Sequence, residues 1–190
     1  MIRTARVLSE VLAPWVIVLL LPSAVAWQAT RSAPLALGWG LWVALTSSLL
    51  PMAVIVRGAR RGRWDGHHVR NREGRLIPFL VLLVSSTTGL AVLVLASAPA
   101  ALIALDVAMI ACLVVTGLIT TRWKVSMHTA VAGGAVVILA IAVGPVLWWL
   151  APLVAAIGWS RVRLGDHTPA QVAVGALTGA AVGGGVFALF

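Results

Sequence analysis

The hydrophobic pattern of the chain consists of long apolar runs separated by short polar connections. A helix that spans a bilayer needs about 20 mostly apolar residues, and seven runs approach that length. They are Val11–Trp27, Pro34–Val56, Leu76–Ala96, Ala101–Thr121, Thr129–Val143, Pro145–Trp159 and Ala170–Phe190. The pattern predicts an all-α fold, a polytopic membrane bundle of six to seven transmembrane helices. Six result if one of the two short runs that flank Gly144 is re-entrant.

The connections between these runs are of two kinds, which alternate along the chain. Short turns with almost no charge alternate with polar segments rich in arginine. Because successive spans end on opposite faces, all but one of the 14 Lys and Arg residues fall on one face, and Arg31 alone falls on the other. Cytoplasmic loops accumulate Lys and Arg, so this face is predicted to be cytoplasmic. We expect one domain, 1–190, with two N-terminal spans (1–56), a basic cytoplasmic loop (57–75) and a core bundle (76–190).

The composition agrees with a multi-pass protein of the cell membrane. Apolar residues make up 61% of the chain and charged residues only 10%, whereas a soluble domain carries about 25% charged residues. The formal net charge of +9 must therefore sit in a few loops. There it favours anionic lipid head groups or phosphorylated substrates as partners, rather than nucleic acid. The oligomeric state cannot be predicted from this pattern.

The first apolar run has a second interpretation. Arg3 and Arg6, the apolar stretch and the small residues 24–26 also fit a cleaved signal peptide. A span is the simpler account, because the first two runs are both long enough to cross a bilayer and are joined by a short polar turn.

One arginine-rich connection, Ser160–Gln171, combines a histidine with the start of a helix. Thr168 can serve as N-cap, Pro169 suits the first helical position, and Gln171 completes a capping box. His167 would then precede a helix N-terminus, where backbone N–H groups favour an anion. An imidazole beside an anion site, with Arg161 to bind oxygens in a bidentate manner, suits phosphoryl transfer to histidine. A helix cap flanked by surface arginines explains the segment equally well.

Two other connections add histidines and cations to the same face. Residues 122–129 place Lys124, Ser126 and His128 at the start of another helix, and the two helix starts could converge on one anion. Residues 65–78 bring further basic groups to that face, namely His67, His68, Arg70, Arg72 and Arg75. A solvated loop that binds anionic lipid explains this segment as well.

These motifs resemble the type 2 phosphatidic acid phosphatase superfamily, which comprises lipid phosphate phosphatases and vanadium haloperoxidases. The family reads Lys-x6-Arg-Pro, Pro-Ser-Gly-His and Ser-Arg-x5-His-x3-Asp. Ser160, Arg161 and His167 match the third motif with its spacing. Ser126 and His128 match the second motif, in which Val125 and Met127 replace proline and glycine. The first motif is matched loosely: Arg75 fits its arginine, His68 falls on its lysine and Leu76 replaces its proline.

The resemblance implies a mechanism without a metal. His167 would be the nucleophile that forms a phosphohistidine, and His128 would be the general acid. The phosphate would be bound by Arg75, Ser126, Arg161 and Lys124, with His68, Arg70 and Arg72 nearby. Gln171 stands where the family has an aspartate that orients the nucleophile. A neutral amide can fix the histidine tautomer, but it stabilises an imidazolium less than a carboxylate does.

Three functions remain open at the level of the sequence. The first is a phosphatase for a lipid phosphate or diphosphate, with an isoprenoid diphosphate as the preferred substrate. The second is a prenyl diphosphate lyase or terpene-cyclase-like enzyme, in which Trp123 and Trp159 would stabilise a carbocation and Mg²⁺ could take part. The third is a non-catalytic lipid-binding protein. Gly175, Gly179 and Gly183 are expected to allow close helix packing, and Asp106 is expected to lie far from the chemistry.

Overall fold

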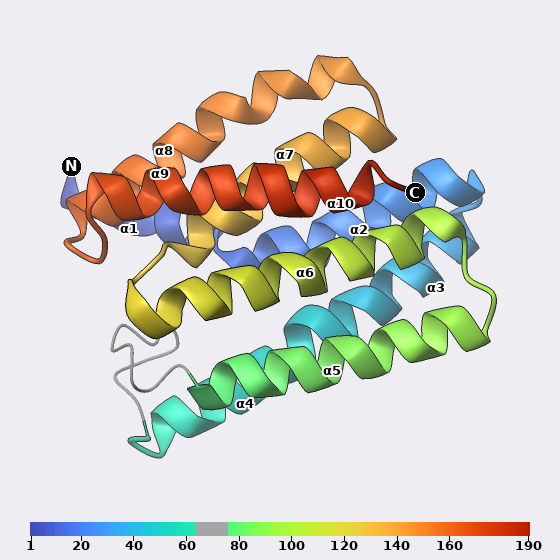
Figure 1. The fold of residues 1–190 in the computed structure, drawn as a ribbon, viewed down its shortest axis with the longest axis horizontal. Coiled ribbons are helices and arrows are strands. Elements are labelled where there is room, and N and C mark those ends of the chain that lie inside the picture. Colours follow the sequence, from blue (N-terminus) through green and yellow to red (C-terminus); the bar gives the residue numbers. More distant parts are fainter. Residues whose placement is uncertain (64–75) are drawn as a thin grey trace.

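The computed structural model describes residues 1–63 and 76–190, and these residues form helices and turns without a strand (Figure 1). In chain order the elements are α1 (Ile2–Val11), α2 (Pro14–Thr30), α3 (Ala33–Ala44), the π-helical segment η1 (Leu45–Leu49), α4 (Leu50–Arg60), α5 (Leu76–Leu95), α6 (Ala100–Arg122), α7 (Met127–Ala142), the 3₁₀ segment η3 (Pro145–Leu150), α8 (Ala151–Arg163), α9 (Pro169–Thr178), the π-helical segment η4 (Gly179–Gly184) and α10 (Gly185–Phe187).

Five continuous helical segments among the described residues are long and apolar enough to cross a bilayer. They are Ala33–Arg60, Leu76–Leu95, Ala100–Arg122, Pro145–Arg163 and Pro169–Phe187. The pair α1 and α2, bent by 40°, would be a sixth, and α7 is a shorter apolar helix. The predicted all-helical membrane bundle is thus confirmed and the chain has the character of a multi-pass membrane protein, but the described residues provide five to six helices long enough to span, against the six to seven predicted.

The first ten residues form a separate helix that the apolar pattern did not predict. Helix α1 ends at Val11, and Pro14 occupies the first turn of α2, where a proline is tolerated and a continuous helix is broken. Ala5 and Ser9, one turn apart, are the buried residues of α1, which packs against α8. This helix therefore brings a buried hydroxyl next to the end of α8.

The span from Ala33 to Arg60 widens to a π-helix just before Pro51. Proline lacks the N–H that would bond to the carbonyl of Ser47, and its ring clashes with that carbonyl in a regular α-helix. Two hydroxyls of this segment bond to neighbouring helices: Ser48 donates to the carbonyl of Trp15 at 2.9 Å, and Ser47 donates to Asp106 at 3.2 Å. Asp106 is fully buried and bonds to another helix, in keeping with a structural role.

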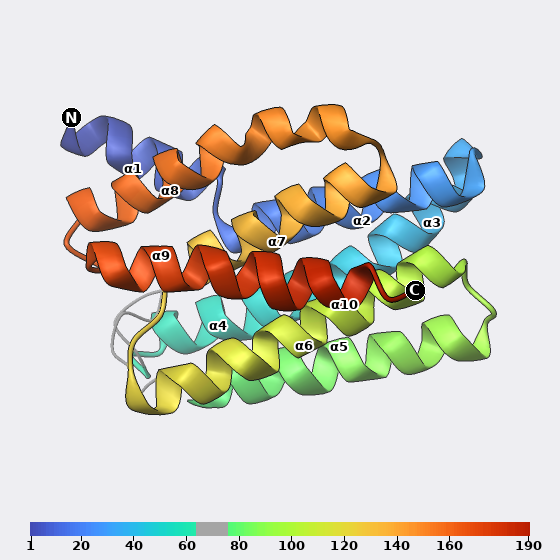
Figure 2. The same cartoon turned by 45° about the horizontal axis from the view of Figure 1, so that its top comes forward.

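The helices run back and forth between two ends of the bundle (Figures 1 and 2). The N-terminus, the end of α4, the α6–α7 turn and the α8–α9 turn lie at one end, which we call the basic end. Its described cations are Arg3, Arg6, Arg57, Arg60, Arg61, Arg63, Arg122, Lys124, Arg161 and Arg163. Arg31, in the α2–α3 turn, lies at the opposite end. The predicted alternation of charged and uncharged connections is therefore present in the described fold.

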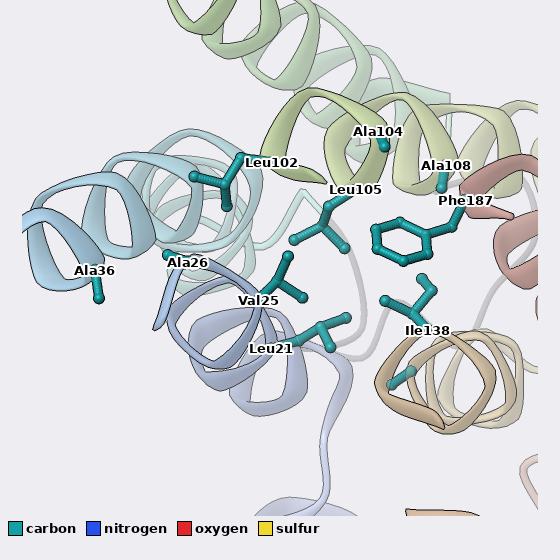
Figure 3. Close-up of a cluster of buried hydrophobic side chains, with 11 residues drawn as sticks. Leu21, Val25, Ala26, Ala36, Leu102, Ala104, Leu105, Ala108, Ile138 and Phe187 are labelled. Carbon is teal, nitrogen blue, oxygen red and sulfur yellow. The ribbon is translucent and has the colours of Figure 1, made fainter. Parts of the chain in front are cut away.

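A hydrophobic core forms where α2, α6, α7 and α10 meet (Figure 3). Leu21, Val25, Leu105, Ile138 and Phe187 point toward one another in its centre. Since α2 supplies two of these side chains, the first apolar run is part of the packed bundle.

Glycines allow α9 and η4 to lie directly against α7. A Cβ atom at Gly175 would lie 2.5 Å from the carbonyl oxygen of Ser126, and one at Gly179 would run into the backbone of Ala130. Only glycine permits such an approach. This contact sets the starts of α7 and α9 side by side, and both starts carry a candidate catalytic histidine.

Candidate active site

A cavity of about 230 Å³ begins at the basic end and extends into the bundle. Lys124, His128, Arg161, Asp166 and His167 line its polar part. The rest of its wall is mostly apolar and comes from α2, η1, α4, α5, α6 and α7, with Gly183 of η4. The structure thus brings both predicted catalytic histidines and two predicted phosphate ligands to one cavity with a polar mouth and an apolar interior.

His167 is held by the capping box that the sequence predicts. Thr168 is the N-cap of α9, Pro169 follows it, and the side chains and backbones of Thr168 and Gln171 bond reciprocally. The left-handed φ of +72° at Gly165 turns the chain between α8 and this cap. His167 is nine-tenths buried, and its Nδ1 lies 3.1 Å from Oε1 of Gln171.

The Gln171 amide determines which nitrogen of His167 carries a proton. The same Oε1 atom accepts a hydrogen bond from the backbone N–H of Thr168 at 3.2 Å. A backbone N–H can only donate, so the amide atom that faces Thr168 must be the oxygen. Nδ1 of His167 faces that oxygen too and must therefore donate. In the neutral imidazole the lone pair then resides on Nε2, the nitrogen required for nucleophilic attack.

Arg161 forms a buried ion pair with Asp166. Its Nη2 lies 2.9 Å from Oδ2 of Asp166, and both side chains are almost fully buried. Its Nη1 donates to the hydroxyl of Ser9 in α1. Asp166 directly precedes His167 in the sequence. The ion pair engages the Asp166 carboxylate with Arg161, and Gln171 contacts the imidazole instead.

The ion pair also changes the predicted bidentate grip of Arg161 on phosphate. Both terminal nitrogens of the guanidinium already contact protein groups. A guanidinium has five N–H donors, so Arg161 can keep these two contacts and still bind a phosphate. The two contacts fix the orientation of the guanidinium. Arg161 is therefore preorganised by two residues, Ser9 and Asp166.

Lys124 fastens the turn before α7 to the turn before α9. Its Nζ donates to the backbone carbonyl of Asp166 at 2.7 Å. The backbone N–H of Ser126 donates to the carbonyl of Gln171 at 3.2 Å, which joins the same two segments a second time. The predicted convergence of two helix starts is thus produced by hydrogen bonds between them.

His128 and Ser126 have different positions although they are close in sequence. His128, the second residue of α7, is buried and lines the cavity. Ser126 is the N-cap of α7, accepts from the N–H of Thr129 at 3.4 Å, and is not among the residues that line the cavity. The Ser126 hydroxyl therefore starts the helix that carries His128, and its contact with phosphate stays a prediction.

Four other predicted phosphate-binding residues, His68, Arg70, Arg72 and Arg75, lie outside the described residues. The two tryptophans proposed for carbocation stabilisation, Trp123 and Trp159, are exposed and do not line the described cavity. Trp15 and Phe79 line it instead.

Sequence reasoning missed Ser9, Trp15 and Phe79. Ser9 carries a detectable signal, because it lies one turn after Ala5 on the small-residue face of a short amphipathic segment. Trp15 and Phe79 lie near the starts of α2 and α5 and resemble interfacial anchors in the sequence. No group of three or more His, Cys, Asp or Glu residues that could hold a metal ion occurs in 1–63 and 76–190.

Comparisons with known proteins do not extend this description. No protein-family model, curated protein or solved structure matches the chain.

Proposed function

We propose that this chain is a membrane-embedded phosphatase that hydrolyses a lipid phosphate or diphosphate through a phosphohistidine at His167. The observation that carries the proposal is the shared hydrogen bond of Gln171, whose oxygen accepts from both Thr168 and His167, and His167 lines the cavity. It leaves the imidazole lone pair on Nε2. A structural histidine would not need that tautomer, whereas a nucleophile does.

In the first step Nε2 of His167 attacks the terminal phosphorus, and the bond from phosphorus to the leaving oxygen breaks. His128, as the imidazolium, donates a proton to that oxygen, so the alcohol or prenyl monophosphate leaves with its charge neutralised. Lys124 and Arg161 lie in the same wall and stabilise the negative charge of the transferring group. The oxygen of Gln171 accepts from Nδ1–H throughout and steadies the imidazolium that develops.

In the second step neutral His128 takes a proton from water, and the hydroxide attacks phosphorus. The bond from phosphorus to nitrogen breaks, which releases inorganic phosphate and restores Nε2 of His167. His128 regains the proton that it gave up, so the cycle closes without a metal or an oxidant.

The first experiment is turnover of a panel of lipid phosphates and prenyl diphosphates by the purified protein in detergent, with all products resolved by mass spectrometry. We expect inorganic phosphate, a loss of roughly a thousandfold or more in His167→Ala, and a loss of about 10²–10⁴-fold in His128→Ala. Arg163→Ala, an exposed cation at the same end of the bundle, is the control and should retain activity.

Other products would replace the proposal by a defined alternative. Inorganic diphosphate with a hydrocarbon, still formed by His167→Ala, would identify a prenyl diphosphate lyase. Lipid binding without any turnover across the panel would identify a non-catalytic lipid-binding protein.

A further inference from the structure

The inner part of the cavity differs in chemistry from its mouth. Beyond the charged residues its wall is mostly apolar, and it reaches Leu21 of α2, Ala108 of α6 and Ile138 of α7. These three residues also belong to the hydrophobic core (Figure 3). Ile138 lies ten residues after His128, about 15 Å along a helix at 1.5 Å per residue.

The dimensions suit one hydrocarbon chain. The cavity volume of about 230 Å³ lies below the range of roughly 300–1,000 Å³ for pockets that hold drug-sized ligands. The cavity has room for a single chain end-on, with the phosphate at Lys124 and Arg161.

Gly183 has a different environment from the other glycines of the last span. Gly175 and Gly179 are required by backbone contact with α7. A Cβ atom at Gly183 would instead meet Gly134 at 3.6 Å and Cys112 at 3.9 Å, which are ordinary contact distances. Helix packing therefore does not require a glycine at 183. Residues 112, 134 and 183 all line the cavity. The absence of a side chain at Gly183 therefore keeps this part of the cavity open.

We propose that the cavity takes a single-chain lipid phosphate, such as a short prenyl phosphate, and that Gly183 sets the length of chain it accepts. This inference rests on the proposed function for the head group, but the position of the chain is tested separately. Gly183 lies level with Gly134, six residues beyond His128 and about 9 Å along α7. A larger side chain there would close the inner part of the cavity and leave the mouth unchanged.

The test uses a non-hydrolysable prenyl phosphonate with a photoreactive group at the end of its chain, in dimethylallyl, geranyl and farnesyl lengths. In the wild-type protein we expect the farnesyl probe to label residues at the inner end, around Leu21, Ala108 and Ile138. In Gly183→Leu its affinity should fall by at least about tenfold, the scale of one misplaced methylene group in a tight pocket. The dimethylallyl probe should change less than about twofold.

Two further variants keep the test decisive. Gly185→Leu is the matched control, because residue 185 is exposed and a Cβ atom added there would meet no atom within 4 Å; it should bind all three probes as the wild type does. If Gly183→Leu does not fold, Gly183→Ala replaces it in the test. It adds one methyl group at ordinary contact distance and should lower the affinity for the farnesyl probe relative to the dimethylallyl probe, to a smaller extent than leucine would.

Labelling on the outer surface of the bundle, or equal loss of all three probes in Gly183→Leu, would overturn the inference. Preferred binding of two-chain phosphatidic acid over the farnesyl probe would overturn it too. Labelling by the phosphonate does not require turnover. If the wild-type protein is labelled at the inner end but hydrolyses none of the lipid phosphates in the substrate panel, the proposed function is refuted and the binding site for the chain stands.

Discussion

At the scale of single residues, Gln171 is the position at which the sequence departs from the phosphatase motif proposed for it. The family's motif has an aspartate at this position, and here the amide contacts the imidazole through Oε1. The amide contributes no charge, so the transition state loses part of the stabilisation that a carboxylate gives to the imidazolium. In the proposed mechanism Gln171 is a positioning residue that acts through His167.

This assignment predicts opposite effects for two substitutions. Gln171→Glu keeps the acceptor and adds charge, so phosphate release should rise by roughly fivefold, the effect of about 1 kcal/mol from a charge-assisted hydrogen bond. Gln171→Leu removes the acceptor and should lower the rate. Nitrogen NMR of the His167 ring should show the Nδ1–H tautomer in the wild type and a shift toward Nε2–H in the leucine variant. An unchanged tautomer in Gln171→Leu would contradict the assignment.

The sequence predicted the contacts of single residues only where those contacts depend on residues nearby in the chain. The cap at Thr168, Pro169 and Gln171 depends on neighbours within four positions, and the structure confirms it. The contact of Arg161 with Ser9 joins residues 152 positions apart, and no local sequence pattern predicts this contact.

At the scale of elements, the contact between α7 and the segment formed by α9 and η4 positions the two histidines. Glycines at 175 and 179 remove the side chains that would hold these helices apart. The apolar runs predicted where the long helices lie, because bilayer thickness fixes their length. They did not predict the break at Pro14 or the π-helical turns, which depend on how single prolines and glycines are accommodated between neighbouring helices.

Helix contact at Gly179 predicts a large loss of stability from a single methyl group. Gly179→Ala would place its Cβ against the backbone of Ala130, and overpacking of this kind costs about 1–3 kcal/mol or more. Thermal unfolding in detergent should show a clear decrease in Tm. Gly185→Ala, exposed on the same span, should leave the Tm unchanged or raise it slightly, because alanine favours a helix more than glycine does; an equal decrease in both variants would contradict the packing explanation.

At the scale of the whole molecule, the two ends of the bundle differ in charge. Cations gather at the end that carries the cavity mouth, and Arg31 is at the other end. The positive-inside rule then predicts that the proposed site faces the cytoplasm. Substrate would enter from the inner leaflet, with its phosphate near the cations and its chain among the helices.

The orientation can be measured with single cysteines in intact cells. Cys112 is buried and should not react with a membrane-impermeant thiol reagent, so it contributes little background. We expect Arg31→Cys to be labelled from outside and Arg163→Cys to be labelled only after the membrane is permeabilised. The reverse pattern would place the basic end outside the cell.

A rapid-quench experiment that captures the covalent intermediate measures the proposed phosphohistidine at His167 most directly. Wild-type protein is mixed with the best substrate from the panel, quenched in alkali to preserve a phosphoramidate, and digested for mass spectrometry. We expect phosphate on the peptide that contains His167, more of it in His128→Ala if breakdown slows more than formation, and none in His167→Ala. Turnover to phosphate with the label on another residue, or with no covalent intermediate while His167→Ala remains active, would contradict it.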